Sequence, residues 1–395
     1  MKNKLMKLLK SNNLLYQAYF YLGSAIMSIL AIFIPVDRRM ILFNSYGGKK
    51  YDDSTKAIYE KMLTDERFKD FKFIWAFHDP SMFHPPRATK IRTDGLKYFY
   101  YTLRAGCWVT NSAIERGLMY KNKKTFYLNT LHGSPIKKLG KEISKDKNYF
   151  YAKLRPKWKV DAICAQCAHD TDAFVSAFGI THEQILNSGL PRNDILATHT
   201  PEMKESIRKK LNLPADKKIL LYTTTFREYS KDEMLNCIIA PPIDLARWER
   251  ELGDEYAVIF SAHYEISKVL NIQNNGFIRD YSSHPVYNDL LIVSDIMICD
   301  YSSVFFDYAI MGKPMLSFGY DYHEYMQKRG MNFDLRAELP NGMVHTEDDL
   351  LEQLKALDFD DASRKTVAFR EKHLRYYANA SQICIDAIWE KGGYG

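Results

Sequence analysis

The sequence from Ser294 to Asp321 reads SDIMICDYSSVFFDYAIMGKPMLSFGYD, and its pattern decides the fold class. Two apolar runs, Ile296–Cys299 and Met315–Phe318, have the length and composition of buried strands. A helical pattern begins at Val304 between them and ends before a Gly-Lys-Pro turn. Strand, helix and strand in this order predict a βαβ unit, in which a helix joins two parallel strands and covers the sheet.

A polar tetrapeptide, Asp300–Ser303, directly follows the first of these strands. Ser302 or Ser303 is placed to cap the helix, which would leave backbone N–H groups and the positive helix end for an anion. Ligands of parallel sheets bind beyond the carboxyl ends of the strands, where this tetrapeptide lies. An ordinary helix cap without a ligand is the alternative, and this stretch alone does not separate the two.

Two further polar residues follow strands of the same expected sheet. Arg227 comes just beyond the apolar run Lys218–Thr223, and His263 directly follows Tyr256–Ser261. The carboxyl ends of parallel strands meet at one edge of a sheet, so we expect these side chains to lie near the serines. Because an arginine fork donates two parallel hydrogen bonds to a phosphate, the group is expected to bind an anion.

The first half of the chain shows the same alternation of apolar runs and helical patterns. The expected strands are Met40–Asn44, Phe71–Phe77, Cys107–Thr110, Thr125–Leu131, Ala162–Ala165 and Gln184–Asn187. This alternation predicts a second α/β domain, with a parallel sheet covered by helices on both faces. A turn at 188–194 and the polar stretch after it mark the boundary. We therefore expect domains at 37–198 and 199–395, the second closed by C-terminal helices.

A histidine ends the strand expected at Thr125–Leu131. His132 is followed by Gly133, which permits close approach of the backbone to a ligand, and by Ser134 and Pro135. Imidazole takes up a proton near neutral pH, so we expect His132 to act as a general base at the ligand edge of the sheet. A purely structural histidine is the alternative.

The N-terminal segment 1–36 is expected to associate with a membrane. Four lysines within the first ten residues precede an uncharged stretch in which Leu14–Ile34 is long enough, as a helix, to cross a bilayer core. Two forms remain open: a spanning anchor, or a helix that lies in the membrane surface with its lysines at acidic headgroups. A buried core helix is the third possibility.

A strongly basic segment at 137–159 follows the candidate base. It carries nine lysines and arginines against two acidic residues, with aromatic residues interleaved. This composition suits a membrane surface, an anionic polymer or nucleic acid, and a solvated loop is the alternative. Because an apolar segment precedes it in the chain, we expect acidic lipid as the partner and no nucleic acid. The net charge of +7 also favours an anionic partner.

The composition is that of a folded protein of ordinary type. The 395 residues are 46% hydrophobic and 26% charged, which excludes a disordered chain. The six cysteines include one C-x-x-C pair, Cys164 and Cys167, and no second pair that would complete a zinc site. We expect reduced thiols in a cytosolic compartment and no cofactor or required metal, although Asp300 and Asp321 could recruit a divalent ion.

Six segments of the chain resemble the CDP-glycerol:poly(glycerophosphate) glycerophosphotransferase family, the teichoic-acid-type primases and polymerases. They are GGKKYDDSTKAIYE (Gly47–Glu60), LHGSPIKKLG (Leu131–Gly140), GLPRND (Gly189–Asp194), LLYTTTFRE (Leu220–Glu228), the opening stretch, and YDYHEYMQKRG (Tyr320–Gly330). They occur in the family's order. The resemblance implies a GT-B-like fold, with two Rossmann-type domains that face a cleft and a CDP-alditol bound mainly by the second domain.

The resemblance also implies roles for individual residues. His132 would be the base that activates the acceptor hydroxyl, and His263 would lie against the donor pyrophosphate and assist the departure of CMP. The residues that would hold the donor are Arg227, Ser302, Ser303, Asp307 and Arg329, with Asp307 at the ribose hydroxyls. The acceptor-side loop would include Gly133, Ser134 and Lys137.

The implied enzyme is a phosphotransferase at the cytoplasmic face of the cell membrane. A hydroxyl of a lipid-linked or polymeric acceptor would attack the alditol-bearing phosphorus of CDP-glycerol or CDP-ribitol and release CMP, in synthesis of a teichoic acid or a capsule-type polymer. Positioning and charge neutralisation dominate such transfer, which suits histidine, arginine and serine. Two alternatives stay open: a GT-B glycosyltransferase that uses a nucleotide sugar, and a non-catalytic protein that binds membrane or nucleic acid.

Overall fold

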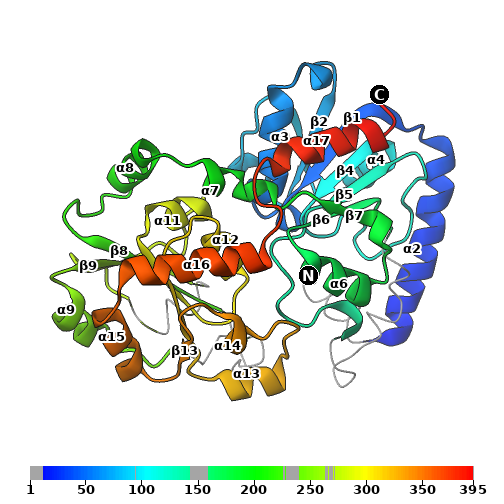
Figure 1. The fold of residues 1–395 in the computed structure, drawn as a ribbon. Helices are drawn as coiled ribbons and strands as arrows, with labels where there is room; N and C mark the ends of the chain where they lie inside the picture. Colours follow the sequence, from blue (N-terminus) through cyan, green and yellow to red (C-terminus); the bar gives the residue numbers. More distant parts are fainter. Residues whose placement is uncertain are drawn as a thin grey trace. The chain divides into compact units, whose positions relative to one another are not determined.

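A computed structural model describes residues 12–93, 95–142, 159–225, 227, 240–262, 266, 270 and 272–394 (Figure 1). The chain divides into two compact units. Unit 1 consists of the described residues of Met1–His132, Leu139–Asp194 and Ala378–Gly395. Unit 2 consists of those of Gly133–Lys138 and Ile195–Tyr377. The chain therefore first leaves unit 1 directly after His132.

Unit 1 is built on a parallel sheet of seven strands in the order β3-β2-β1-β4-β5-β6-β7. The strands are β1 (Asp37–Asn44), β2 (Lys72–Phe77), β3 (Ala88–Arg92), β4 (Ala105–Thr110), β5 (Phe126–Asn129), β6 (Ala162–Ala165) and β7 (Ile185–Asn187). Leu42 of β1 pairs with Ile74 of β2 on one side and with Trp108 of β4 on the other. The direction of the strand order reverses between β1 and β4, and such switch points bind ligands in open α/β sheets.

Helices cover both faces of this sheet, as the sequence predicts. Alternate residues of β1 point to opposite faces, so Ile41 and Phe43 enter one apolar cluster and Leu42 the other. The helices on the face of Phe43 are α3 (Asp53–Leu63) and α17 (Ala380–Lys391), and those on the face of Leu42 are α2 (Asn13–Phe33), α4 (Leu96–Arg104) and α6 (Ala168–Phe178). Short 3-10 turns are η1 (Tyr46–Gly48), η2 (Glu66–Phe68), η3 (Pro80–Met82), η4 (Gly140–Glu142), η5 (His182–Gln184) and η6 (Pro191–Asn193).

The last helix, α17, belongs to unit 1, which differs from the expected second domain at 199–395. Its residues Cys384, Ile385 and Ile388 are fully buried in the unit 1 core. The Sγ atom of Cys384 lies 3.5 Å from that of Cys164 in β6, and both thiols are free. An apolar helix face shows that a helix is packed but not which sheet it packs on, so the sequence could not assign α17.

Unit 2 contains a second parallel sheet, of six strands in the order β10-β9-β8-β11-β12-β13. The strands are β8 (Lys218–Thr224), β9 (Tyr256–Ala262), β10 (Ile278–Asp280), β11 (Ile296–Cys299), β12 (Met315–Phe318) and β13 (Met343–Val344). The expected βαβ unit is confirmed: β11 and β12 are parallel neighbours, with Met297 opposite Met315. The switch point of this sheet lies between β8 and β11.

The helices of unit 2 also pack on both faces of its sheet. Leu221 of β8 enters one apolar cluster, and Leu220 and Tyr222 enter the other. The helices are α8 (Pro201–Lys210), α9 (Leu245–Leu252), α11 (Tyr287–Val293), α12 (Val304–Ala309), α13 (Tyr322–Lys328), α14 (Leu335–Glu338), α15 (Glu347–Lys355) and α16 (Phe359–His373), and α7 (Asp194–Thr198) joins the units. The chain thus has the two parallel-sheet α/β domains that the sequence predicts.

Helix α2 lies along unit 1 (Figure 1, blue) and is long and apolar enough to cross a membrane. One side is packed: Tyr16, Phe20 and Met27 are buried. The Tyr19 hydroxyl donates to the backbone oxygen of Arg116 at 2.8 Å, which ties this side to the rest of the unit. The opposite side is apolar and exposed, with residues Leu14, Leu15, Tyr21, Leu22, Ile26, Ile29, Leu30, Ile32 and Phe33.

Candidate functional site

His132 lies at the carboxyl edge of the unit 1 sheet, shortly after β5 ends at Asn129. Its Nδ1 is 3.1 Å from the backbone oxygen of Asn111, the residue that follows β4. A carbonyl oxygen only accepts hydrogen bonds, so Nδ1 of the neutral ring carries the proton and Nε2 keeps its lone pair. The His132 side chain is exposed. This arrangement leaves Nε2 able to take a proton from a bound hydroxyl group.

Tyr46 supports His132 from the loop after β1. The two ring centroids are 5.7 Å apart. The backbone N–H of Tyr46 donates to Oδ1 of Asn111 at 2.8 Å, and Asn111 in turn holds His132. The loops after β1, β4 and β5 therefore converge on the imidazole at the switch point of the sheet. The sequence did not single out Tyr46 or Asn111.

A buried carboxylate, Asp53, lies behind Tyr46 at the start of α3. Its Oδ2 accepts the Tyr46 hydroxyl at 2.5 Å and Nη1 of Arg192 at 2.9 Å, and its Oδ1 accepts the Ser54 N–H at 2.6 Å. Burial alone would raise the pKa of Asp53, but the Arg192 charge and these hydrogen bonds outweigh burial and hold the pKa below its ordinary value. Asp53 is therefore ionised at neutral pH.

The loop that follows His132 is part of unit 2. Gly133 has φ 146°, a conformation that L side chains rarely adopt, and Ser134 is buried. Lys137 forms an antiparallel bridge with Met331, and its Nζ lies 5.7 Å from the ring centroid of Tyr325 in α13. The three residues expected in the acceptor-side loop, Gly133, Ser134 and Lys137, thus belong to unit 2.

Arg227 is fully buried beyond the end of β8. Its Nη1 donates to Oδ2 of Asp300 at 2.9 Å, while Nε and Nη2 donate to the two carboxylate oxygens of Asp321 at 2.7 and 2.8 Å. Although burial disfavours its charge, the two carboxylates raise the pKa of Arg227 above its ordinary value. The guanidinium bonds to both carboxylates, which suits a residue that positions the loops at this edge of the sheet. Its contact with a donor phosphate stays a prediction.

The two carboxylates that bind Arg227 also accept hydrogen bonds from other groups. Asp300 follows β11 and accepts the Thr224 hydroxyl at 2.7 Å and the Thr225 N–H at 2.9 Å, besides Arg227. The pKa of Asp300 is lowered because these contacts outweigh the effect of burial. Asp321 also accepts the Tyr301 hydroxyl at 2.9 Å. These contacts tie the ends of β8, β11 and β12 together at the switch point of unit 2.

The two serines lie beside this cluster and are partly exposed. The Oγ of Ser302 is 3.3 Å from the Val304 N–H, and Ser303 occupies the N-cap position of α12. Asp307, expected at the ribose hydroxyls, is buried in α12 with 4% of its surface exposed. The serines therefore remain available at the ligand edge, whereas the Asp307 side chain is enclosed in the core side of its helix.

Two expected donor-side residues remain, Arg329 and His263, and the structure describes only the first. Arg329, at the end of α13, is half-buried, and its Nη1 donates to the backbone oxygen of Lys138 at 2.8 Å. His263 lies outside the described residues, as does most of the basic segment, 143–158. Among the described residues no group of three or more His, Cys, Asp or Glu side chains could hold a metal ion. Asp300 and Asp321 do not fit a metal site because Arg227 occupies both.

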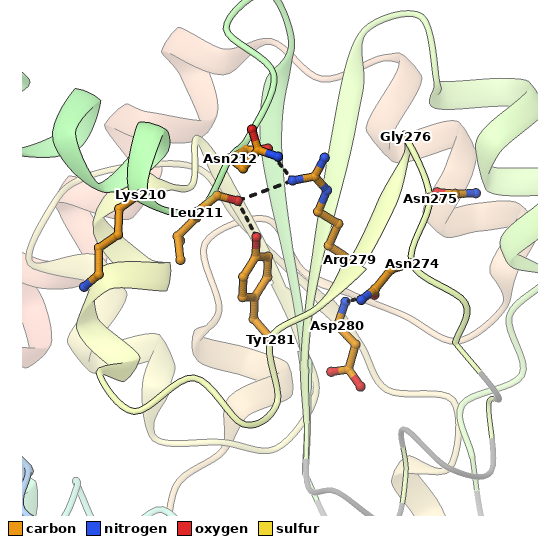
Figure 2. A pocket seen from close by; sticks show the side chains of 9 residues that line it. All are labelled: Lys210, Leu211, Asn212, Asn274, Asn275, Gly276, Arg279, Asp280 and Tyr281. Atoms are coloured by element: carbon orange, nitrogen blue, oxygen red, sulfur yellow. Dashed lines mark hydrogen bonds between the residues drawn. The ribbon is translucent and has the colours of Figure 1, made fainter.

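A hollow of about 590 Å³ lies elsewhere in unit 2, beside the edge strand β10 (Figure 2). Figure 2 shows the Arg279 guanidinium donating to the backbone oxygens of Leu211 and Asn212. The Tyr281 hydroxyl donates to Leu211 as well. These hydrogen bonds hold the segment that connects α8 to β8. The hollow lies at the edge strand β10, whereas the switch point lies between β8 and β11 in the interior of the sheet. Each unit therefore has its candidate site at its own switch point.

Comparison with known proteins gives a consistent result. The family described as CDP-Glycerol:Poly(glycerophosphate) glycerophosphotransferase matches residues 26–390. A teichoic acid poly(glycerol phosphate) polymerase of Staphylococcus epidermidis is 34% identical over 341 residues, which are 82% of this chain and 46% of that protein. The chain thus spans about half the length of that relative. A teichoic acid glycerol-phosphate transferase of Staphylococcus aureus is 31% identical over 337 residues, 82% of this chain and 85% of that protein.

A solved structure shares the fold over almost the whole chain. It is a histidine-to-asparagine variant of the wall teichoic acid polymerase TagF, soaked with CDPG. It superposes with a TM-score of 0.81 at 31% sequence identity, and the match covers 91% of this chain and 90% of that one.

Proposed function

Because the chain belongs to the CDP-glycerol:poly(glycerophosphate) glycerophosphotransferase family, we propose that it transfers an alditol phosphate from a CDP-alditol to a hydroxyl of a lipid-linked or polymeric acceptor. The relatives described above are named for glycerol phosphate, so CDP-glycerol is the proposed donor and CDP-ribitol the alternative. The product is a polymer of the teichoic acid type.

The observation that carries the proposal is the fixed tautomer of His132. With Nδ1 bound to the Asn111 carbonyl, Nε2 is the nitrogen that keeps a lone pair and can act as a base. It takes the proton of the acceptor hydroxyl while the hydroxyl oxygen bonds to the alditol-bearing phosphorus. The bond from that phosphorus to the bridging oxygen breaks, and CMP leaves with the electron pair. General base catalysis of this kind contributes typically about 10²–10⁴ in rate.

The donor-side unit supports the same reaction through its charge and hydroxyl groups. Ser302 and Ser303 present hydroxyls at the switch point of unit 2, and Lys137 and Arg329 add cationic groups on the same unit. Arg227 fixes the loops that carry these groups by holding Asp300 and Asp321. Preorganised donors and cations stabilise the charge that develops on a transferring phosphoryl group without reorganising during the reaction.

Release of CMP tests the proposed function. The purified protein is incubated with a lipid-linked acceptor and, separately, with CDP-glycerol, CDP-ribitol or a nucleotide sugar. We expect acceptor-dependent CMP release with one of the two CDP-alditols and no consumption of the nucleotide sugar. Consumption of the nucleotide sugar with no CMP release would instead favour a glycosyltransferase, which the same fold could support.

We also propose that α2 binds the membrane in the plane of its surface and holds unit 1 at the cytoplasmic face. Its buried residues Tyr16, Phe20 and Met27 are spread over three turns, and Met27 belongs to an apolar cluster of unit 1. A helix attached to a folded domain over that length cannot cross a bilayer without carrying the domain into lipid. Its opposite apolar side suits insertion between acidic headgroups and acyl chains. Of the two forms left open by the sequence, the contacts favour the interfacial one.

Replacing Leu22 and Ile29 by glutamate should release the protein from membranes. These side chains are 64% and 56% exposed and lie two turns apart on the outer side of α2, so the fold should tolerate the change. Loss of two inserted apolar side chains should lower binding to vesicles of phosphatidylglycerol and phosphatidylcholine at least about tenfold in a sedimentation assay. Met82→Glu is the control, at 69% exposure on another part of unit 1. Unchanged binding of the double variant would reject α2 as the membrane contact.

A further inference from the structure

Tyr46 links the candidate base to the buried interior of unit 1, because it contacts both His132 and the buried Asp53. It lies in η1, directly after β1, with φ 47° in the left-handed region that non-glycine residues seldom adopt. A backbone held in this conformation must be fixed by its surroundings. For Tyr46 the fixing contacts come from three different segments of the unit, at residues 53, 111 and 132.

The contacts of Tyr46 affect two properties of His132 that matter for a base: the orientation of its imidazole ring and its tautomer. The Tyr46 ring contacts the imidazole at a centroid distance of 5.7 Å and an interplanar angle of 50°, which limits rotation of the imidazole. The Tyr46 N–H holds the Asn111 side chain, and the Asn111 carbonyl sets the tautomer of His132. The same ring lies within reach of a cation–π contact once His132 has taken a proton.

The Tyr46 ring is itself anchored by an ion pair. Its hydroxyl donates to Asp53 at 2.5 Å, and Asp53 is held by Arg192 at 2.9 Å with side-chain exposures of 4% and 13%. The backbone N–H of Arg192 also donates to Ser54 Oγ at 3.3 Å, so Arg192 and the start of α3 are joined twice. A hydrogen bond to an ionised, buried carboxylate is among the stronger types and fixes the phenol direction.

From these contacts we infer that Tyr46 is a positioning residue for His132, and that the Asp53–Arg192 ion pair holds Tyr46 in place. The inference rests on the proposed function, because it assigns His132 the role of base. Tyr46 does not touch the reacting atoms. It holds the imidazole in the orientation in which Nδ1 bonds to Asn111, so a proton transfer step needs no search for the productive rotamer. Displacement of a catalytic group by about 1 Å can cost about a hundredfold in rate.

Tyr46→Phe tests this inference because it removes only the hydroxyl that anchors the ring. We expect kcat for CMP release to fall between about tenfold and about a hundredfold, while KM for CDP-glycerol stays within about twofold. The matched control is Tyr51→Phe, in the same loop, whose hydroxyl is buried without a hydrogen-bond partner among the described residues. That variant should retain the wild-type kcat. Asp53 keeps Arg192 and Ser54 as partners in Tyr46→Phe, so the variant should stay folded at the assay temperature, which its thermal unfolding curve checks.

Nitrogen NMR of the imidazole of His132 gives a readout that does not need turnover. Its signal is identified by its loss in His132→Asn. In the wild type we expect the tautomer with the proton on Nδ1. In Tyr46→Phe we expect a shift toward the Nε2–H form, because an imidazole that an unanchored ring no longer holds can turn away from the Asn111 carbonyl. A wild type without CMP release would reject the proposed function, and the spectra would still decide the role of Tyr46. An unchanged spectrum and unchanged kcat in Tyr46→Phe would overturn the inference.

Discussion

Replacing His132 by alanine is expected to remove nearly all transfer of alditol phosphate while binding of the CDP-alditol remains almost unchanged. His132 is the exposed side chain at the unit 1 switch point whose tautomer is fixed for proton uptake. Loss of a general base lowers the rate by about 10²–10⁴, and the groups proposed to bind the donor lie on unit 2. CMP release measures the first effect, and calorimetric titration with CDP-glycerol measures the second.

The control for this variant is His182→Ala, which removes another exposed histidine of unit 1, at η5. It should keep wild-type turnover and donor affinity. Turnover retained in His132→Ala would contradict the role of His132 as base. A loss of donor affinity equal to the loss of turnover would instead place His132 among the donor-binding groups.

Replacing Arg227 by methionine is expected to cause the largest loss of stability. Its side chain is 0% exposed and neutralises Asp300 and Asp321, whose side chains are 3% and 9% exposed. Removing one partner of a buried ion pair leaves uncompensated charge and costs about 3–5 kcal/mol, and here two carboxylates lose the partner. The free energy of unfolding of the variant, measured in urea, should fall by at least this amount.

Two further variants sharpen this result. Arg364→Met removes an arginine that is 70% exposed and pairs with Asp361 one helical turn away, so its unfolding midpoint should match the wild type. Arg227→Lys keeps the charge but loses the planar fork that contacts both acids, so its stability should lie between those of the wild type and Arg227→Met. If Arg227→Met unfolds at the same urea concentration as Arg364→Met, the proposed positioning role is wrong.

The strands that the sequence predicts best are those buried on both faces. Ile296–Cys299 and Met315–Phe318 have the same bounds in the structure as in the pattern, because strands buried on both faces are continuous apolar runs. The sequence missed Ala88–Arg92 and Met343–Val344. These are edge strands of their sheets and carry exposed or half-buried residues, so no apolar run marks them.

The candidate site was predictable where a single residue follows a strand, and was missed where residues far apart in the chain must meet. His132 could be selected from its place after an apolar run. The role of Arg227 could not, because nothing in the sequence shows that Asp300 and Asp321 converge on it. Tyr46 was missed because its loop reads as a glycine-rich entry to α3. One sequence feature pointed to this loop: Asp53, the hydrogen-bond partner of Tyr46, lies in the segment Gly47–Glu60 that resembles the family.

In the proposed reaction phosphorus moves to the acceptor together with the alditol. CDP-glycerol with radioactive phosphorus at the glycerol-bearing position, incubated with a lipid-linked acceptor, tests this directly. We expect the label in the lipid-linked product and unlabelled CMP in solution, and neither of them with His132→Ala. Label that remains wholly in the nucleotide while the acceptor is extended would show that the alditol moves without its phosphate.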